Sequence, residues 1–160
     1  MSKNKDTRTF GAKKVLHLLL KGGELFRDLQ GRACGTFEFG GKLTTFLVDS
    51  KEFRSTLATF SFEKLKSPLM ESECDVVVGA LSEKAQSMPR REVFVRVGHG
   101  EGNIVVDLCL DDGMVVVVEP GKWQTTTKYD IKFRHPKGML ALPAPDARHG
   151  DLRTRTGTVF

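Results

Sequence analysis

The chain has 160 residues and carries 25 Lys and Arg against 20 Asp and Glu, which gives a formal net charge of +5. This length suits one domain with a core of its own that needs no metal or disulfide to fold. Cys34, Cys74 and Cys109 lie far apart without C-x-x-C spacing, which favours a reducing, cytoplasmic setting over a secreted one. The apolar run "VLHLLL" is too short to span a membrane, and no small-residue cleavage site follows it, so we expect no membrane partner.

The basic side chains gather at the two ends of the chain. Residues 1–32 hold eight basic and three acidic groups, residues 33–120 hold nine and fourteen, and residues 121–160 hold eight and three. Basic ends around an acidic middle suggest contact with a polyanion such as nucleic acid through the ends. Lysine-rich tails that only improve solubility are the alternative reading.

The N-terminal half predicts a helix followed by a β-hairpin. Residues 10–21 have apolar positions that fit a short buried helix, and Gly22-Gly23 ends it. A strand then enters a turn at Gln30-Gly31. Strands over about residues 32–39 and 42–48 follow, joined by Gly40-Gly41, which supply the positive φ angles of a tight hairpin turn.

Two helices are expected next. Ser50 is placed to cap the first, whose stripe of Phe53, Leu57, Phe60 and Leu65 would pack on the hairpin. The second is expected from about residue 72 to residue 88, although three consecutive valines weaken its helical propensity. Its inward side chains would be Cys74, Val77, Val78, Leu81 and Ala85.

From Arg91 onward the sequence alternates β-branched runs with the turn sequences "GHGEGN", "DDG" and "EPGKW", which predicts a meander of three or four antiparallel strands. The fold class is therefore α+β, with an antiparallel sheet made of the N-terminal hairpin plus the C-terminal meander and two to three helices packed on it. We expect a flexible basic N-terminus over residues 1–9, a single α+β domain over residues 10–145, and a basic tail over residues 146–160.

A cluster of acid and histidine side chains raises the question of catalysis. His99, Glu101, Asp107, Asp111 and Asp112 are residue types that bind metals or move protons, and a metal-dependent nuclease could be built on the three aspartates. The favoured reading is structural, because Asp-Asp-Gly is a hairpin-turn sequence in which acidic residues bond to their own backbone. "GHGEGN" is likewise interpreted as a glycine-rich turn.

Other catalytic motifs are missing from the sequence. Neither "GGKLTT" nor "GHGEGN" meets the requirements of a P-loop, there is no G-x-S-x-G motif, and the cysteines fall on apolar faces. We therefore expect a protein that is not an enzyme, with no catalytic residue, no metal site and no cofactor.

Surface recognition is the remaining class. Aromatic and basic residues interleave after residue 121, and such a pattern can stack on unpaired bases while neutralising phosphates. The partner expected is nucleic acid, with single-stranded DNA as one candidate. The alternative is that Trp123, Tyr129 and Phe133 alternate into the core while the cations face water. The candidate nucleic-acid-binding residues are Lys122, Trp123, Lys128, Lys132, Arg134 and Lys137.

Three blocks of the sequence carry a resemblance to a known family. They are "ELFRDLQGRACGTFEFGGKLTTFLVDSKEFRSTLATFSF", "REVFVRVGHGEGNIVVDLCLDDGMVVVVEPGKW" and "IKFRHPKGMLALPAP". In this order they resemble the region just upstream of the helicase/ATPase domain in phage and prophage replication proteins of the primase-helicase type. The resemblance covers about residues 24–145 and contains no catalytic motif.

The resemblance implies a non-catalytic accessory domain of a mobile-element replication protein that binds nucleic acid weakly, with a helicase/ATPase domain or another replication protein as a partner. Met114 stands where the family usually has an aromatic residue, and His135 stands in its "FRRP" block. The chain ends where the motor domain would begin, so ATPase or primase activity is not carried over. The alternative function is a protein-interaction or oligomerisation module without DNA affinity, for which a homodimer is one expected form.

Overall fold

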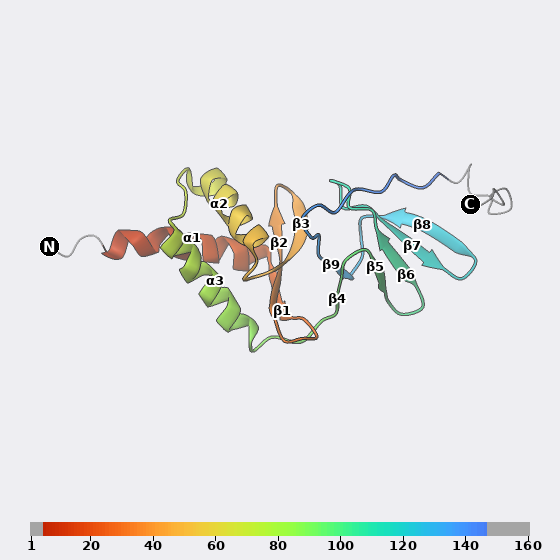
Figure 1. Ribbon diagram of the computed structural model, residues 1–160, viewed down its shortest axis with the longest axis horizontal. Helices are drawn as coiled ribbons and strands as arrows, with labels where there is room; N and C mark the ends of the chain where they lie inside the picture. The colour runs from red at the N-terminus through yellow and green to blue at the C-terminus, as the bar shows by residue number, and fades with distance from the viewer. Residues whose placement is uncertain (1–4, 147–160) are drawn as a thin grey trace, which may run out of the picture.

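The computed structural model of the chain describes residues 5–146, so the first four residues and nearly all of the expected basic tail lie outside the described part (Figure 1). Helices and antiparallel sheets are both present, which confirms the α+β class. No helix in the described part is long and apolar enough to cross a membrane. The elements are α1 (Lys5–Gly22), β1 (Glu24–Arg27), β2 (Ala33–Phe39), β3 (Lys42–Leu47), α2 (Lys51–Leu65), α3 (Glu71–Ala85), β4 (Val93–Phe94), β5 (Val97–His99), β6 (Ile104–Asp107), β7 (Val115–Glu119), β8 (Lys122–Thr126) and β9 (Lys132–Phe133).

The first sheet has the order β1-β2-β3, and its tight hairpin lies where the sequence predicts it. Phe39 pairs with Lys42 across the turn, and Gly40 and Gly41 have φ angles of 58° and 80°. Only residues that tolerate left-handed backbone make such a turn without strain, which explains the Gly-Gly pair.

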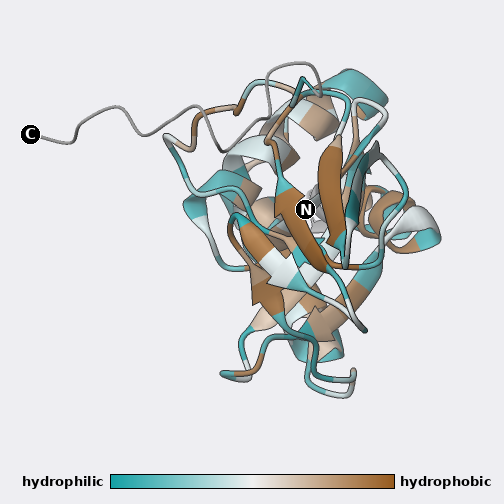
Figure 2. Ribbon diagram, turned by 90° about the vertical axis from the view of Figure 1, so that its right-hand side faces the viewer, coloured by the Kyte–Doolittle hydropathy of each residue, from teal (hydrophilic) through white to brown (hydrophobic). Residues whose placement is uncertain are grey.

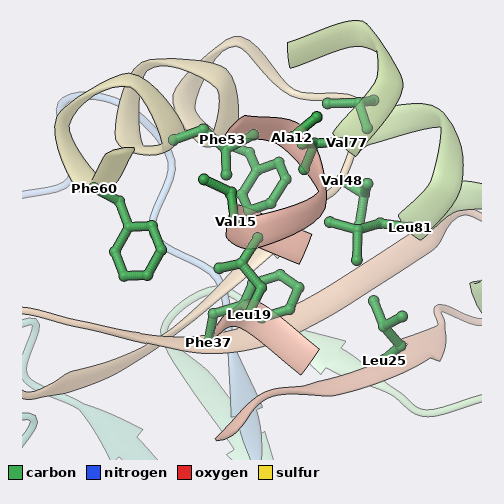
Figure 3. Packing of buried hydrophobic residues seen from close by; sticks show 12 residues of the cluster. Ala12, Val15, Leu19, Leu25, Phe37, Val48, Phe53, Phe60, Val77 and Leu81 are labelled. Atoms are coloured by element: carbon green, nitrogen blue, oxygen red, sulfur yellow. The ribbon is translucent and has the colours of Figure 1, made fainter. Parts of the chain in front are cut away.

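The three helices pack on one face of this sheet and enclose the larger hydrophobic core (Figures 1 and 3). The Ser50 hydroxyl accepts a 3.1 Å hydrogen bond from the Phe53 amide and so caps α2, as predicted. The expected inward stripes of α2 and α3 are confirmed by burial, except that Leu65 is only partly buried. The core residues are Ala12, Val15, Leu19, Leu25, Phe37, Val48, Phe53, Leu57, Phe60, Val77, Val78 and Leu81.

The meander forms a second antiparallel sheet with the order β5-β6-β7-β8. One face of it packs against the region of β4 and β9 and buries a smaller cluster made of Val105, Val115, Val117 and Phe133. The hairpin and the meander therefore belong to separate sheets rather than to one. Between them lies the short parallel pair β4–β9, a non-local pairing that no hairpin pattern in the sequence could announce.

The two sheets are connected through the β4–β9 pair. Thr45 of β3 forms a parallel bridge with Arg134, and Arg27 of β1 forms one with Arg90. Near these bridges Glu24 forms ion pairs with Lys132 at 2.8 Å and with Arg91 at 2.9 Å. In Figure 1 the helices, the first sheet and the second sheet consequently follow one another along the long axis.

Candidate functional site

The six residues predicted to bind nucleic acid fall into separate surroundings. Lys122 and Trp123 lie on β8, an edge strand of the second sheet, and Lys128 lies in the loop after it. The Lys122 ammonium forms a 2.9 Å ion pair with Glu119, and its side chain is exposed. Lys137 is exposed in the turn after β9.

The two remaining cations lie deeper in the molecule. The Lys132 side chain is only 15% exposed and forms an ion pair with Glu24, so it joins β9 to the first sheet. Arg134 lines a different hollow, together with Asp28 and Arg32. Lys122 and Trp123 are thus consecutive on one strand with their side chains on opposite faces, whereas Lys132 and Arg134 have other neighbours.

The aromatic residues divide in the same way. Phe133 is 5% exposed and belongs to the smaller core, whereas Trp123 is 45% exposed and Tyr129 is 37% exposed. The reading in which all three rings alternate into the core therefore holds for Phe133 alone. The Tyr129 ring lies edge-on to Phe133, and burial together with the charge of Asp107 raises the Tyr129 pKa.

The acidic cluster of the sequence is dispersed. Asp112 accepts a 3.0 Å hydrogen bond from the Met114 amide, which is the turn role expected of it, and Gly113 has a φ of 71°. His99 is the last residue of β5 rather than part of the turn, because it pairs with Ile104. Within residues 5–146, no group of three or more His, Cys, Asp or Glu side chains is arranged to hold a metal ion.

Asp107 has a different environment from the other aspartates. It is 2% exposed at the end of β6, where one carboxylate oxygen contacts His135 Nε2 and the other accepts a 2.9 Å hydrogen bond from the Cys109 amide. Burial tends to raise the pKa of Asp107, but the hydrogen bonds from His135 and Cys109 outweigh it and leave the pKa below its usual range. The pair ties the second sheet to the segment after β9.

A cleft of about 380 Å³ lies between the two sheets, lined by the β2–β3 hairpin, the turn at residues 111–113 and the segment from Thr127 to His135. This volume is within the range of small-molecule sites. Some of its polar groups already have partners, since Thr36 Oγ1 and Thr45 Oγ1 share a 2.8 Å hydrogen bond and Lys42 Nζ donates one of 2.8 Å to the Leu110 carbonyl. The Lys42 ammonium and these two hydroxyl groups are therefore engaged within the chain.

The most unusual surface is the outer face of the second sheet, which we define as Val97, Ile104, Val106, Val116, Val118, Trp123 and Thr125. Strand register places these side chains in two rows on the side opposite the smaller core. One row runs Val97–Val106–Val116–Thr125, and the other runs Ile104–Val118–Trp123. His99 is the β5 partner of Ile104, but its ring lies edge-on to Phe94 and is not counted in the face.

The outer face is apolar although it faces water. Val97 is 55% exposed, Ile104 50% and Val118 38%, and Figure 2, which looks onto this end of the molecule, shows hydrophobic runs along the strands. An antiparallel sheet with one solvated face normally alternates apolar and polar residues. Here β7 reads Val-Val-Val-Val-Glu, a composition typical of a strand that is covered on both sides.

Sequence reasoning missed the outer face and the contact between Asp107 and His135. The run of valines was visible, but it was interpreted only as strand propensity. Its alternate members could have been separated into two faces by counting every second residue. Asp107 and His135 are 28 positions apart, and no sequence pattern pairs them.

Comparison of the chain with protein-family models, with curated proteins and with solved structures gives no significant match.

Proposed function

We propose that the chain is a non-catalytic protein-interaction module and that the outer face is its contact surface. The observation that carries this proposal is the pair of apolar cross-strand rows, which are open to water on a sheet whose other face is already packed. Exposed apolar patches of this kind mark interaction sites in soluble proteins. None of the seven side chains is Lys, Arg, Asp or Glu, and charged residues are depleted in the centres of protein interfaces.

The sequence resemblance supplies a setting for this module. It suggests an accessory domain of a phage or prophage replication protein, working in the cytoplasm beside a helicase/ATPase domain or another replication protein. The module would contribute binding rather than chemistry, in keeping with a cleft in which Thr36, Thr45 and Lys42 already bond within the chain.

Site-specific photocrosslinking in the host cell tests the proposal. A photoreactive residue replaces Val118 on the outer face or, as the control, Val76, which is 48% exposed on α3. We expect protein adducts from position 118 and none of the same identity from position 76, with mass spectrometry naming the crosslinked chain. Equal adducts at the two positions, or no protein adduct at 118, would contradict the proposal.

Weak nucleic-acid binding is the second candidate function. Trp123 is 45% exposed and can stack on an unpaired base, while Lys128 and Lys137 are exposed and form no ion pair within residues 5–146. Lys128 and Lys137 lie in the loops that follow β8 and β9, and neither belongs to the outer face. Binding would therefore use the β8 edge and the segment that follows it.

A salt titration with a labelled single-stranded oligonucleotide tests this second function. Affinity should fall as salt rises, because neutralised phosphates release counterions, and base stacking should quench Trp123, the only tryptophan in the chain. Lys128→Gln should weaken binding and flatten the salt slope, whereas Lys84→Gln on α3 should do neither. Absence of binding at low salt, or binding indifferent to salt, removes this candidate.

A further inference from the structure

We infer that the occupant of the outer face is a second copy of this chain, packed sheet against sheet. This inference rests on the proposed interaction function and names its partner. Four strands present a surface of β-branched side chains and one indole, and an identical surface meets the same requirements of shape and polarity. Two such sheets pack about 10 Å apart with their side chains interdigitated.

Charge is the first argument for a second copy. A strongly charged partner would leave its ions without counter-charges on the outer face, and burying an unpaired charge is costly. The nearest charged pair, Glu119 and Lys122 at the two sides of the β7–β8 turn, forms its own 2.9 Å ion pair within the chain. Because side chains alternate along a strand, both residues point to the face opposite Val118 and Trp123. None of the seven residues of the outer face is Lys, Arg, Asp or Glu, so a second copy brings no such charge to the contact.

Shape is the second argument. The central cleft, the hollow beside Arg134 and a groove between Leu18 and Phe60 include no residue of the outer face. The face is thus separate from these three hollows. A sheet surface that offers side chains in rows is matched by another sheet, whose side chains interdigitate with them.

Area is the third argument, and it sets the strength of the contact. The exposed fractions of the outer face leave on the order of 500 Å² in contact with water, an area in the range of the largest apolar patch of a monomer, which is often functional. Two copies would bury about 1,000 Å² in total, which is the lower limit for a specific interface. The dimer should therefore be weak and reversible, with dissociation in the micromolar range or above.

Sedimentation equilibrium of the full chain, from about 10 µM to about 1 mM, measures this association. Trp123 lies in the interface, so its emission should shift to shorter wavelength as the protein concentration rises. Val118→Lys should weaken the dimer at least about tenfold, because it buries a charge that has no partner. Val76→Lys, the same substitution at an exposed position of α3, should leave the dimer unchanged.

Val118→Thr is a second variant for the case that Val118→Lys does not fold. It keeps the branched shape and the strand propensity of valine while adding a hydroxyl. It should also weaken association, and the thermal transition of the monomer should stay in place. A chain that remains monomeric at the highest concentration, or a dimer that ignores both Val118 substitutions, overturns the inference. If position 118 then crosslinks to a different protein in the cell, the interaction function survives and only the second copy is excluded.

Discussion

The two sheets of this protein differ in how many of their faces are covered. The first sheet has helices on one face and the β4–β9 region on the other, and Phe26, on the face away from the helices, is 0% exposed. The second sheet packs on one side only and leaves Val118 38% exposed on the other. On the second sheet valines therefore form both the buried face and the face open to water, so a run of β-branched residues predicts a strand but does not show which of its faces is covered.

The same difference should appear in local stability. The core of the first region contains twelve buried residues, whereas the cluster under the second sheet contains four. Because buried apolar area is the main source of stability, the second sheet should open at a lower free energy than the first. Substitutions in the two regions make this difference measurable.

The largest effect is expected in the first region. Phe37 is 0% exposed, and its ring stacks on Phe53 at a centroid distance of 5.4 Å. Phe37→Ala should lower the free energy of unfolding by about 3–5 kcal/mol, because it removes a ring and leaves a cavity. Urea unfolding followed by far-UV circular dichroism measures the change. Phe62→Ala, at a ring that is 61% exposed on α2, is the control and should change the value little.

A smaller effect, confined more to one sheet, is expected from Val115→Ala. Val115 is 0% exposed under the second sheet, and its loss should cost about 2–3 kcal/mol. The urea midpoint seen by Trp123 fluorescence should move further than the midpoint seen by helical circular dichroism. Val116→Ala, one position along β7 on the opposite face, is the control with the smaller shift. Equal shifts of the two midpoints would show that the sheets unfold as one unit.

Local patterns predicted most of the elements, because the forces that form them act between neighbours in the sequence. The Gly40-Gly41 turn and the cap at Ser50 are examples, since positive φ angles and free amides at a helix start require particular residues nearby. The α3 helix keeps its valine triplet because Val77 and Val78 pack in the core, and this burial outweighs their propensity. Such elements can be derived from the chain alone.

Arrangements between distant segments could not be derived in this way. The parallel pairing of Val93 with Lys132 joins residues 39 positions apart, and nothing local distinguishes it from a meander. Lys132 was expected to meet phosphates, yet it forms an ion pair with Glu24 from the other end of the chain. The structure therefore differs from the sequence prediction more in the candidate site than in the fold. The reason is that contacts between distant segments decide which charged side chains are left free to bind a partner.

The contact between Asp107 and His135 gives the second region a dependence on pH. The Asp107 pKa is lower in the folded chain than in the unfolded chain, so the ionised carboxylate stabilises the fold at pH values above the unfolded pKa of about 3.9. Asp107→Asn should cost about 2 kcal/mol at pH 7 because it removes a charge-assisted hydrogen bond. This difference between the two proteins should shrink as the pH falls below about 4.

Urea unfolding at several pH values between about 7 and about 3 tests the assignment. Asp111→Asn, an exposed carboxylate that follows soon after Asp107 in the chain, is the control and should change the free energy of unfolding by less than about 0.5 kcal/mol. A difference between wild type and Asp107→Asn that stays constant over the whole range would mean that the carboxylate charge does not stabilise the fold.

The smallest effect concerns the ion pairs that the two regions make. Lys132, 15% exposed, connects the second region to Glu24 of the first, whereas Lys122, 72% exposed, pairs with Glu119 within its own hairpin. Lys132→Gln should lower the free energy of unfolding by about 1 kcal/mol, and Lys122→Gln should change it by less than about 0.5 kcal/mol, because water screens an exposed pair. The Lys132 substitution should also separate the Trp123 and circular dichroism midpoints, since it loosens a contact between the sheets. If the two midpoints stay together, the backbone bridges at Thr45 and Arg27 are enough to hold the regions as one unit.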